Sequence, residues 1–161
     1  MKKEKKLRIF IDGGSRGNPG HGACGAVFYG ASGAVLSEEG KYLGRCTNNF
    51  AEYSGLRLAL ASAARIGAEE LEIFSDSELL VKQYNGEYRV KDAALASMME
   101  VIRTAAAGFK AVSLAHVPRA KNKEADRLVN RILDNARHAA PALDKTLAEE
   151  NAPASKQAEL F

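Results

Sequence analysis

The chain has 161 residues, of which 46% are hydrophobic and 27% are charged, and its formal net charge is +3. These values predict one ordinary globular domain with a sizeable core and argue against a disordered chain. The sequence contains no apolar run long enough to cross a bilayer, no signal-peptide pattern at its basic start, and no metal-binding or disulfide pattern around its two cysteines. We therefore expect a cytoplasmic protein that has no membrane partner.

The first part of the chain predicts an antiparallel meander. Residues 7–12 form a candidate strand rich in branched and aromatic side chains, and the glycine-rich segment 13–20 is predicted to be a loop that ends it. Two more strands are predicted over 22–30 and 34–44, and short glycine-rich turns join them.

Helices and strands alternate in the second part. Apolar residues at helical spacing predict helices over 48–67, 77–84, 93–108 and 122–139. Short runs of β-branched and other apolar residues predict strands over 71–75 and 110–117. Right-handed crossovers place the last two strands parallel to the first. We expect an α/β domain over residues 1–139, with a five-stranded mixed sheet flanked by helices.

Residues 140–161 differ in composition from the domain. They are rich in alanine, glutamate and lysine, carry four acidic side chains against two lysines, and show no apolar stripe. We predict a disordered or loosely helical tail, with a tether or partner segment as the alternative. The remaining chain is mildly basic, which is compatible with a polyanionic partner but does not require one.

Four carboxylates occupy positions that the predicted fold would bring together. Asp12 ends the first strand and Asp76 follows the fourth, so neighbouring parallel strands carry both to one edge of the sheet. Glu52 and Asp126 lie near the starts of two helices, on the apolar stripes that should face the sheet. Each residue taken alone is better explained as a turn former, a helix cap or a partner of the helix dipole.

Four acids in one place repel one another strongly unless cations neutralise them. Oxygen ligands without a His or Cys cluster favour Mg²⁺, with Mn²⁺ as a possible substitute. Two such ions about 4 Å apart are the arrangement that cleaves phosphodiesters. The pattern therefore predicts a two-metal nuclease.

Four motifs, in their order and spacing, resemble the type 1 ribonuclease H family. They are DGGSRGNPG at 12–20, RCTNNFAE at 45–52, SDSELLVKQ at 75–83 and HVPRAKNKEADRL at 116–128. The resemblance implies an RNase H-like fold with strand order 3-2-1-4-5. It also implies an endoribonuclease that hydrolyses the RNA strand of RNA–DNA hybrids and leaves 3′-hydroxyl and 5′-phosphate ends. The basic handle loop that some bacterial members insert between the middle helices is missing here, so the match is to a handle-less variant.

The resemblance also implies roles for single residues. The residues that would bind two metal ions and act in catalysis are Asp12, Glu52, Asp76 and Asp126. His116 stands ten residues before Asp126, which implies a part in proton transfer or product release. A hydrogen-bonded structural histidine is an equal alternative for His116.

Substrate contacts are implied by the same motifs. Backbone groups of Gly13 and Gly14, together with Asn48, would contact RNA 2′-hydroxyls, which distinguish RNA from DNA. Three further positions match family contacts to a phosphate of the DNA strand, namely Asn18, Arg45 and Thr47. Asn49 matches a family contact to bases or sugars. The glycine-rich segment does not fit a nucleotide-binding loop, because it lacks the G-x-G-x-x-G pattern and no helix follows it.

Two other functions remain open from the sequence. A nuclease of the same fold that cuts only DNA would share the acids, but the positions that contact 2′-hydroxyls argue against it. A hybrid-binding module without catalysis is the second, and the presence of all four acids argues against that. We expect a monomer that acts on RNA–DNA hybrid without an obligatory protein partner.

Four lysines lie near the start of the chain: Lys2, Lys3, Lys5 and Lys6. They would either add salt-sensitive contacts to phosphates or be solvated without a binding role.

Overall fold

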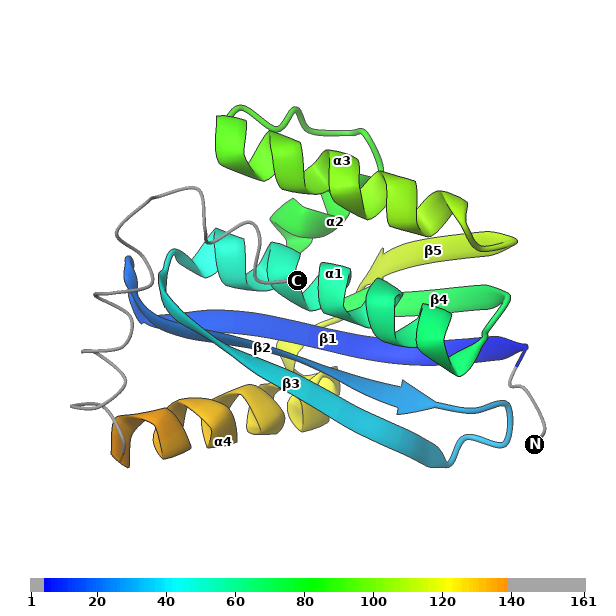
Figure 1. Cartoon of the computed structure of the whole chain (residues 1–161), viewed down its shortest axis with the longest axis horizontal. Helices are drawn as coiled ribbons and strands as arrows, with labels where there is room; N and C mark the ends of the chain where they lie inside the picture. The colour runs from blue at the N-terminus through cyan, green and yellow to red at the C-terminus, as the bar shows by residue number, and fades with distance from the viewer. Residues whose placement is uncertain (1–4, 139–161) are drawn as a thin grey trace.

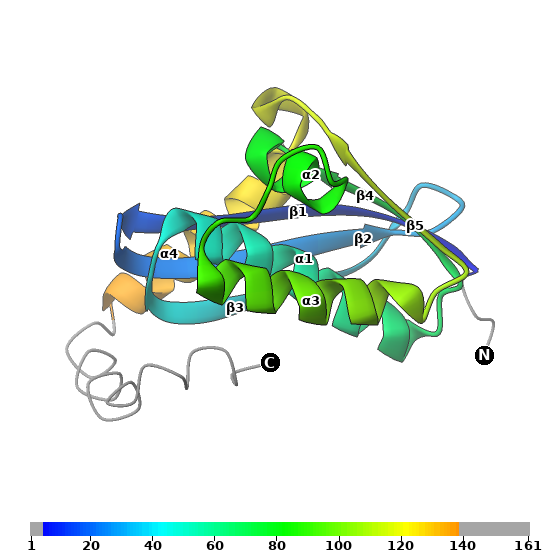
Figure 2. The ribbon, with the colours of Figure 1, turned by 90° about the horizontal axis from the view of Figure 1, so that it is seen from above.

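The structure is a computed structural model that describes residues 5–138. Within this range, a five-stranded sheet of order β3-β2-β1-β4-β5 has helices on both faces (Figure 1). This order and the mixed strand directions confirm the predicted fold class. Figure 2 shows α3 beside α1 on one side of the sheet, while α4 packs on the other side, against β1, β2 and β3.

The strands follow the predicted sequence of elements. β1 (Lys6–Gly17), β2 (Gly20–Tyr29) and β3 (Val35–Cys46) form the antiparallel meander. β4 (Glu70–Ser75) pairs parallel to β1, and β5 (Ala111–His116) pairs parallel to β4. The expected parallel arrangement of the last two strands is therefore confirmed.

The predicted loop over residues 13–20 is wrong. β1 continues to Gly17 in register with β2, and only Asn18 and Pro19, joined by a cis peptide bond, separate the two strands. The glycines of this segment permit close packing here and do not end the strand. A Cβ on Gly13 would fall on the carbonyl group of Ala51, because α1 lies directly against β1 at this point.

The helices agree with the prediction to within a few residues. They are α1 (Asn48–Ile66), α2 (Glu78–Tyr84), α3 (Ala93–Ala107) and α4 (Lys123–His138). Gly67 ends α1 in the left-handed conformation, with φ 87°, as its place after the apolar stripe predicts. A short 3₁₀ helix, η1 (Arg119–Lys121), precedes α4 and has no counterpart in the prediction.

The two faces of β1 lie in different environments. Leu7, Ile9 and Ile11 are fully buried in the core beneath α1. The alternate residues, among them Phe10 and Asp12, point to the side of α4. Figure 1 shows that α4 covers only one half of this side of the sheet, and none of the other helices within residues 5–138 lies over the other half.

Some predictions fall outside the described residues. The predicted tail over 140–161 is one of them, as are Lys2 and Lys3. Across residues 5–138, none of the helices combines the length and apolar character that a membrane crossing requires.

Candidate active site

The predicted carboxylates face one hollow, at the point where the pairing of β1 with β4 ends. The last pair of that register joins Ile11 and Ser75, so the next residue of each segment, Asp12 and Asp76, lies just beyond it at the same edge. α1 and α4 each direct one acid from an early turn toward this edge. The hollow has a volume of about 250 Å³ and is lined by all four carboxylates, those of Asp12, Glu52, Asp76 and Asp126.

Asp12 lies at the electrostatic centre of this hollow. Its burial, followed by the negative charge of Asp76, raises the pKa of Asp12 from 3.8 to about 8; the charges of Asp126 and Glu52 act in the same direction, and a hydrogen bond from the Gly13 backbone opposes them. Since every one of the other three acids influences Asp12, the four carboxylates form one electrostatic unit.

Glu52 is held in place by hydrogen bonds. Asn48 Nδ2 donates to Glu52 Oε1 at 2.6 Å, from one turn earlier in α1. Burial raises the pKa of Glu52, the charge of Asp76 adds to this, and hydrogen bonds with Ser77 and Asn48 oppose it. The carboxylate therefore has a fixed orientation toward the hollow.

Asn48 also ties α1 to the hairpin between β1 and β2. Its backbone N–H donates to Asn18 Oδ1 at 3.1 Å, and its side-chain Oδ1 accepts from the backbone N–H of Ser15 at 3.3 Å. Thr47 caps α1, with its hydroxyl accepting from Phe50 N at 3.2 Å. The structure thus brings together three predicted substrate-binding residues, Asn18, Thr47 and Asn48.

Other predicted substrate-binding residues surround this group. Arg45 is exposed on β3 two residues before Thr47. Gly14 borders the hollow beside the Asn48 side chain, whereas the position of a Cβ on Gly13 shows that this glycine allows α1 to approach β1. Gly13 therefore has a packing role that the sequence did not indicate.

Two predicted residues lie away from the carboxylates. Asn49 lines a separate hollow of about 560 Å³, together with residues of α2 and of the segment 87–92. His116 is exposed at the end of β5, where it pairs in register with Ser75, and it is absent from the lining of the carboxylate hollow. Its catalytic role stays a prediction.

Two arginines at the hollow were missed by the sequence reasoning. Arg119 Nη2 lies 3.6 Å from Asp126 Oδ1, and Arg16 Nη2 lies 2.7 Å from Asp134 Oδ1; both arginines line the hollow. Arg119 belongs to the same sequence motif as His116. A basic residue in a motif that also supplies an acid of the site was the signal that could have identified Arg119. Both arginines place positive charge at the rim of an otherwise acidic hollow.

Asn122 was also missed, and it fixes the geometry beneath the carboxylates. It is 1% exposed, and its Nδ2 donates to the carbonyl oxygen of Ile11 at 2.8 Å, next to Asp12. Its backbone carbonyl oxygen accepts from the backbone N–H of Asp126 at 3.1 Å. One buried residue therefore connects the part of β1 that carries Asp12 to the helix that carries Asp126.

The donor set fits a hard divalent cation in chemistry and charge. The candidate ligands are all carboxylate oxygens, which suit Mg²⁺ or Mn²⁺. Within residues 5–138, no three His, Cys, Asp or Glu side chains already converge tightly enough to chelate one ion. Like charges in a partly buried hollow keep their distance from one another, so the fold brings the carboxylates into one hollow but does not by itself bring them to a single point.

Comparison with known proteins places this site in a family. Residues 10–132 match the model of the reverse transcriptase-like family. A crystal structure of RNase H1 from Halobacterium salinarum superimposes with a TM-score of 0.79 at 41% identity, covering 81% of this chain and 99% of that chain. The chain belongs to the type 1 ribonuclease H family.

Other relatives support the same assignment. The structure of LC11-RNase H1 in complex with RNA/DNA hybrid gives a TM-score of 0.77 at 38% identity, over 81% of this chain and 98% of that one. Among curated proteins, the Halobacterium salinarum ribonuclease HI is 41% identical over 131 residues, and the bifunctional protein Rv2228c of Mycobacterium tuberculosis is 42% identical over 138 residues. The chain spans 66% and 38% of the length of these two relatives, respectively.

Proposed function

We propose that this ribonuclease H family member is an endoribonuclease that hydrolyses the RNA strand of RNA–DNA hybrids and leaves 3′-hydroxyl and 5′-phosphate ends. One observation carries the proposal: four acids from four separate segments face one hollow, beside the hairpin and the helix start that hold Asn48. The relative LC11-RNase H1, which was solved with an RNA/DNA hybrid, supports the choice of substrate.

Asp12, Glu52, Asp76 and Asp126 are the proposed ligands of two Mg²⁺ ions, which Mn²⁺ can replace. When bound, such ions neutralise the carboxylates, lower the pKa of water and stabilise the leaving oxygen of a phosphodiester. Asn48 orients Glu52 into the hollow, and Asn122 fixes the part of β1 that carries Asp12. Arg119 can bind a phosphate of the substrate, because its guanidinium group is exposed at the rim of the hollow.

The selection of RNA is assigned to the hairpin side of the hollow. There, Asn48 and the backbone at Gly14 are close enough to contact the 2′-hydroxyls of a strand that crosses the carboxylates. Asn18, Arg45 and Thr47 form the proposed site for a phosphate of the DNA strand. The hollow beside Asn49 extends the proposed DNA-binding surface along α2, and we assign it to the same DNA strand.

A single-residue substitution tests the metal assignment. We expect Asp76→Asn to reduce hybrid cleavage in Mg²⁺ more than about 100-fold, since losing even an outer partner of a metal ligand costs 10–100-fold. The matched control is Glu100→Gln, which neutralises an exposed carboxylate on α3. Because Glu100 lines neither the carboxylate hollow nor the hollow beside Asn49, this control should cleave like the unchanged protein.

The substrates used in the same assay separate the alternatives. The proposal requires cleavage of the hybrid, with an all-DNA duplex and an all-RNA duplex left intact. Equal cleavage of the DNA duplex would identify a DNA nuclease on this fold. Hybrid binding without cleavage in either Mg²⁺ or Mn²⁺ would identify a binding module, and undiminished cleavage by Asp76→Asn would refute the assignment of the ligands.

All four acids come from one chain, which supports a monomeric enzyme that needs no protein partner at the site. We propose that residues 1–139 form the catalytic domain and that residues 140–161 act as a tail outside it. A cytoplasmic location accords with the proposed substrate and stays part of the proposal.

A further inference from the structure

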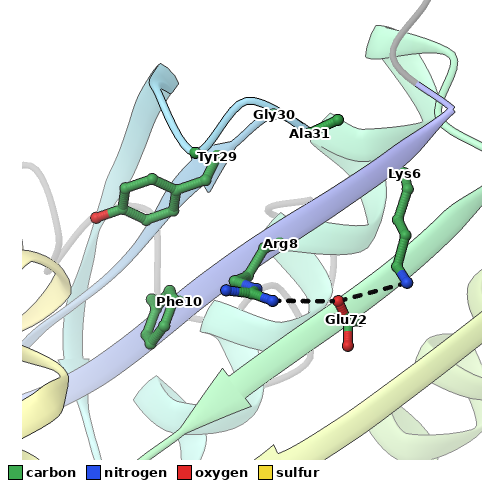
Figure 3. A pocket seen from close by; sticks show the side chains of 8 residues that line it. Lys6, Arg8, Phe10, Tyr29, Gly30, Ala31 and Glu72 are labelled. Atoms are coloured by element: carbon green, nitrogen blue, oxygen red, sulfur yellow. Dashed lines mark ion pairs between the residues drawn. The ribbon is translucent and has the colours of Figure 1, made fainter.

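The half of the sheet that α4 leaves open carries a second hollow, away from the carboxylates. We call this surface the rear face and define it by Lys6, Arg8 and Phe10 of β1, Tyr29 of β2, and Glu72 and Phe74 of β4. Its hollow has a volume of about 530 Å³ and is bordered by the glycine-rich turn that follows β2 (Figure 3). Its aromatic and basic side chains have no part in the proposed catalysis.

Three aromatic rings adjoin one another on the rear face. The Phe10 and Phe74 rings stack with their centroids 4.9 Å apart and an interplanar angle of 25°. The Tyr29 ring meets Phe10 edge-on at 5.7 Å, and the Arg8 guanidinium carbon lies 5.9 Å from the centre of the Phe74 ring. All three rings are only partly buried, so each keeps accessible surface that a base can contact.

Exposed cations lie beside these rings. Lys6 Nζ and Arg8 Nη2 lie 3.6 and 3.7 Å from the same Glu72 oxygen, and the two basic side chains are 56% and 59% exposed. Figure 3 shows both cations reaching this one carboxylate across the hollow. Ion pairs that are long and solvent-exposed contribute little energy, so both cations can exchange Glu72 for a phosphate.

The basic border continues toward the catalytic end of the sheet. A smaller hollow of about 140 Å³ shares Phe10 and Tyr29 with the rear face and is lined on its other side by Lys121 and Lys123, with Glu124 as its single acid. On β1 itself, Lys6, Arg8 and Phe10 alternate on the same side as Asp12, over about 20 Å at roughly 3.3 Å per residue. The rear face thus leads toward the carboxylate hollow.

We propose that the rear face binds a single-stranded polynucleotide, namely the unpaired flank of a hybrid whose paired part lies at the carboxylates. Aromatic rings that accept bases and exposed cations that accept phosphates are the two features that sequence-tolerant single-strand sites share. An acidic peptide would use the cations but would not need three adjoining rings. The role as a flank rests on the proposed function, whereas binding of a free single strand does not.

The primary test is binding in the absence of metal. The full chain is saturated with an unlabelled blunt hybrid, which occupies the catalytic side, and a fluorescent DNA or RNA oligonucleotide of about 12 nucleotides is titrated in EDTA and followed by anisotropy. We expect the oligonucleotide to bind despite the blunt hybrid. Its complete displacement by the hybrid would place it on the catalytic side and overturn the proposal.

Three variants test the chemistry of the rear face. Phe74→Leu keeps an apolar side chain but removes a ring, and should weaken oligonucleotide binding by about tenfold. Arg8→Gln should reduce the slope of log affinity against log salt by about 0.7, the value for one phosphate contact on a single strand. Glu72→Gln removes the carboxylate that competes with phosphate, so binding should become tighter.

Arg65→Gln is the matched control for Arg8→Gln, because Arg65 is also an exposed arginine paired with a glutamate, Glu39, at 3.0 Å, and lies outside the rear face. It should leave the affinity and the salt slope unchanged. Arg8→Gln and Glu72→Gln alter exposed side chains only, so they test the site even if Phe74→Leu unfolds the chain. Unchanged affinity in both, or equal competition by poly-glutamate, would overturn the proposal.

Cleavage of flanked and blunt hybrids in Mg²⁺ separates this inference from the proposed function. If the proposed function and the single-strand site are both correct, Arg8→Gln should raise the KM for the flanked hybrid. The kcat values for the flanked and blunt hybrids should be unchanged by this substitution. If no hybrid is cut but the oligonucleotide still binds as expected, the proposed function fails and the single-strand site survives. Normal cleavage without any rise in anisotropy would refute the single-strand site and leave the proposed function intact.

Discussion

Replacing Asp12 by Asn should abolish activity and at the same time stabilise the metal-free protein. Asp12 is mostly buried, and three other carboxylates act on its charge, so its pKa in the folded chain is about 8 against an ordinary value of 3.8. Asn has nearly the same shape and never ionises. The substitution therefore removes an unfavourable charge and keeps the packing around it.

The sign and size of the effect follow from proton linkage. Below about pH 4, Asp12 is protonated in both states and the variant gains nothing. Between the unfolded and folded pKa values the folded chain keeps a proton that the unfolded chain loses, so the stability of the original protein falls by up to about 1.4 kcal/mol per pH unit. Over the whole interval this amounts to at most about 6 kcal/mol, and the loss is complete once the pH exceeds about 8.

Urea unfolding in EDTA, repeated from about pH 4 to pH 9, measures this difference. The free energies of unfolding of Asp12→Asn and of the original protein should coincide in acid and diverge as the pH rises, with the variant more stable. Asp92→Asn, at the exposed cap of α3, should follow the original protein throughout. A variant that is no more stable than the original near pH 8 would refute the account of the carboxylate hollow.

Three further predictions follow from the same contacts. Millimolar Mg²⁺ should raise the Tm of the original protein and raise that of Asp12→Asn less, because a ligand stabilises the state that binds it; equal shifts in differential scanning fluorimetry would contradict this. Asn122→Ala should lower the free energy of unfolding by about 1–3 kcal/mol, since it leaves the buried Ile11 carbonyl without its donor, and urea titration checks it. Gly13→Ala should destabilise the protein by about 3 kcal/mol or more, because its Cβ would overlap the Ala51 carbonyl; a loss below about 0.5 kcal/mol would show that α1 moves away freely.

The sequence predicted those parts of the site that depend on local periodicity. Asp12 and Asp76 follow branched strands, so the parallel pairing of β1 and β4 was enough to bring them together. Glu52 and Asp126 were located by the apolar stripes of their helices, whose members such as Leu56 are buried as expected. Handedness predicted that β4 and β5 run parallel to β1, and the resemblance to the ribonuclease H family implied the strand order.

What could not be predicted depends on contacts between distant residues. Asn122 bonds to Ile11 across 111 positions, and no local pattern distinguishes it from an ordinary residue before a helix. The glycines of 13–17 were interpreted as breakers because nothing nearby in the sequence shows that α1 lies on them. The rear face was missed for a similar reason: its rings come from three strands that are far apart in the sequence.

The position of Asp126 on α4, the last described element, has a consequence for biosynthesis. Ribosomes make the chain from its N-terminus, so the sheet and three of the acids exist before the fourth is translated. A nascent chain that ends near Val117 contains the sequences of β1 to β5 but lacks both Asp126 and the Asn122 side chain that bonds to Ile11 of β1. A product that terminates before Asp126 therefore lacks one of the four proposed metal ligands and should be inert.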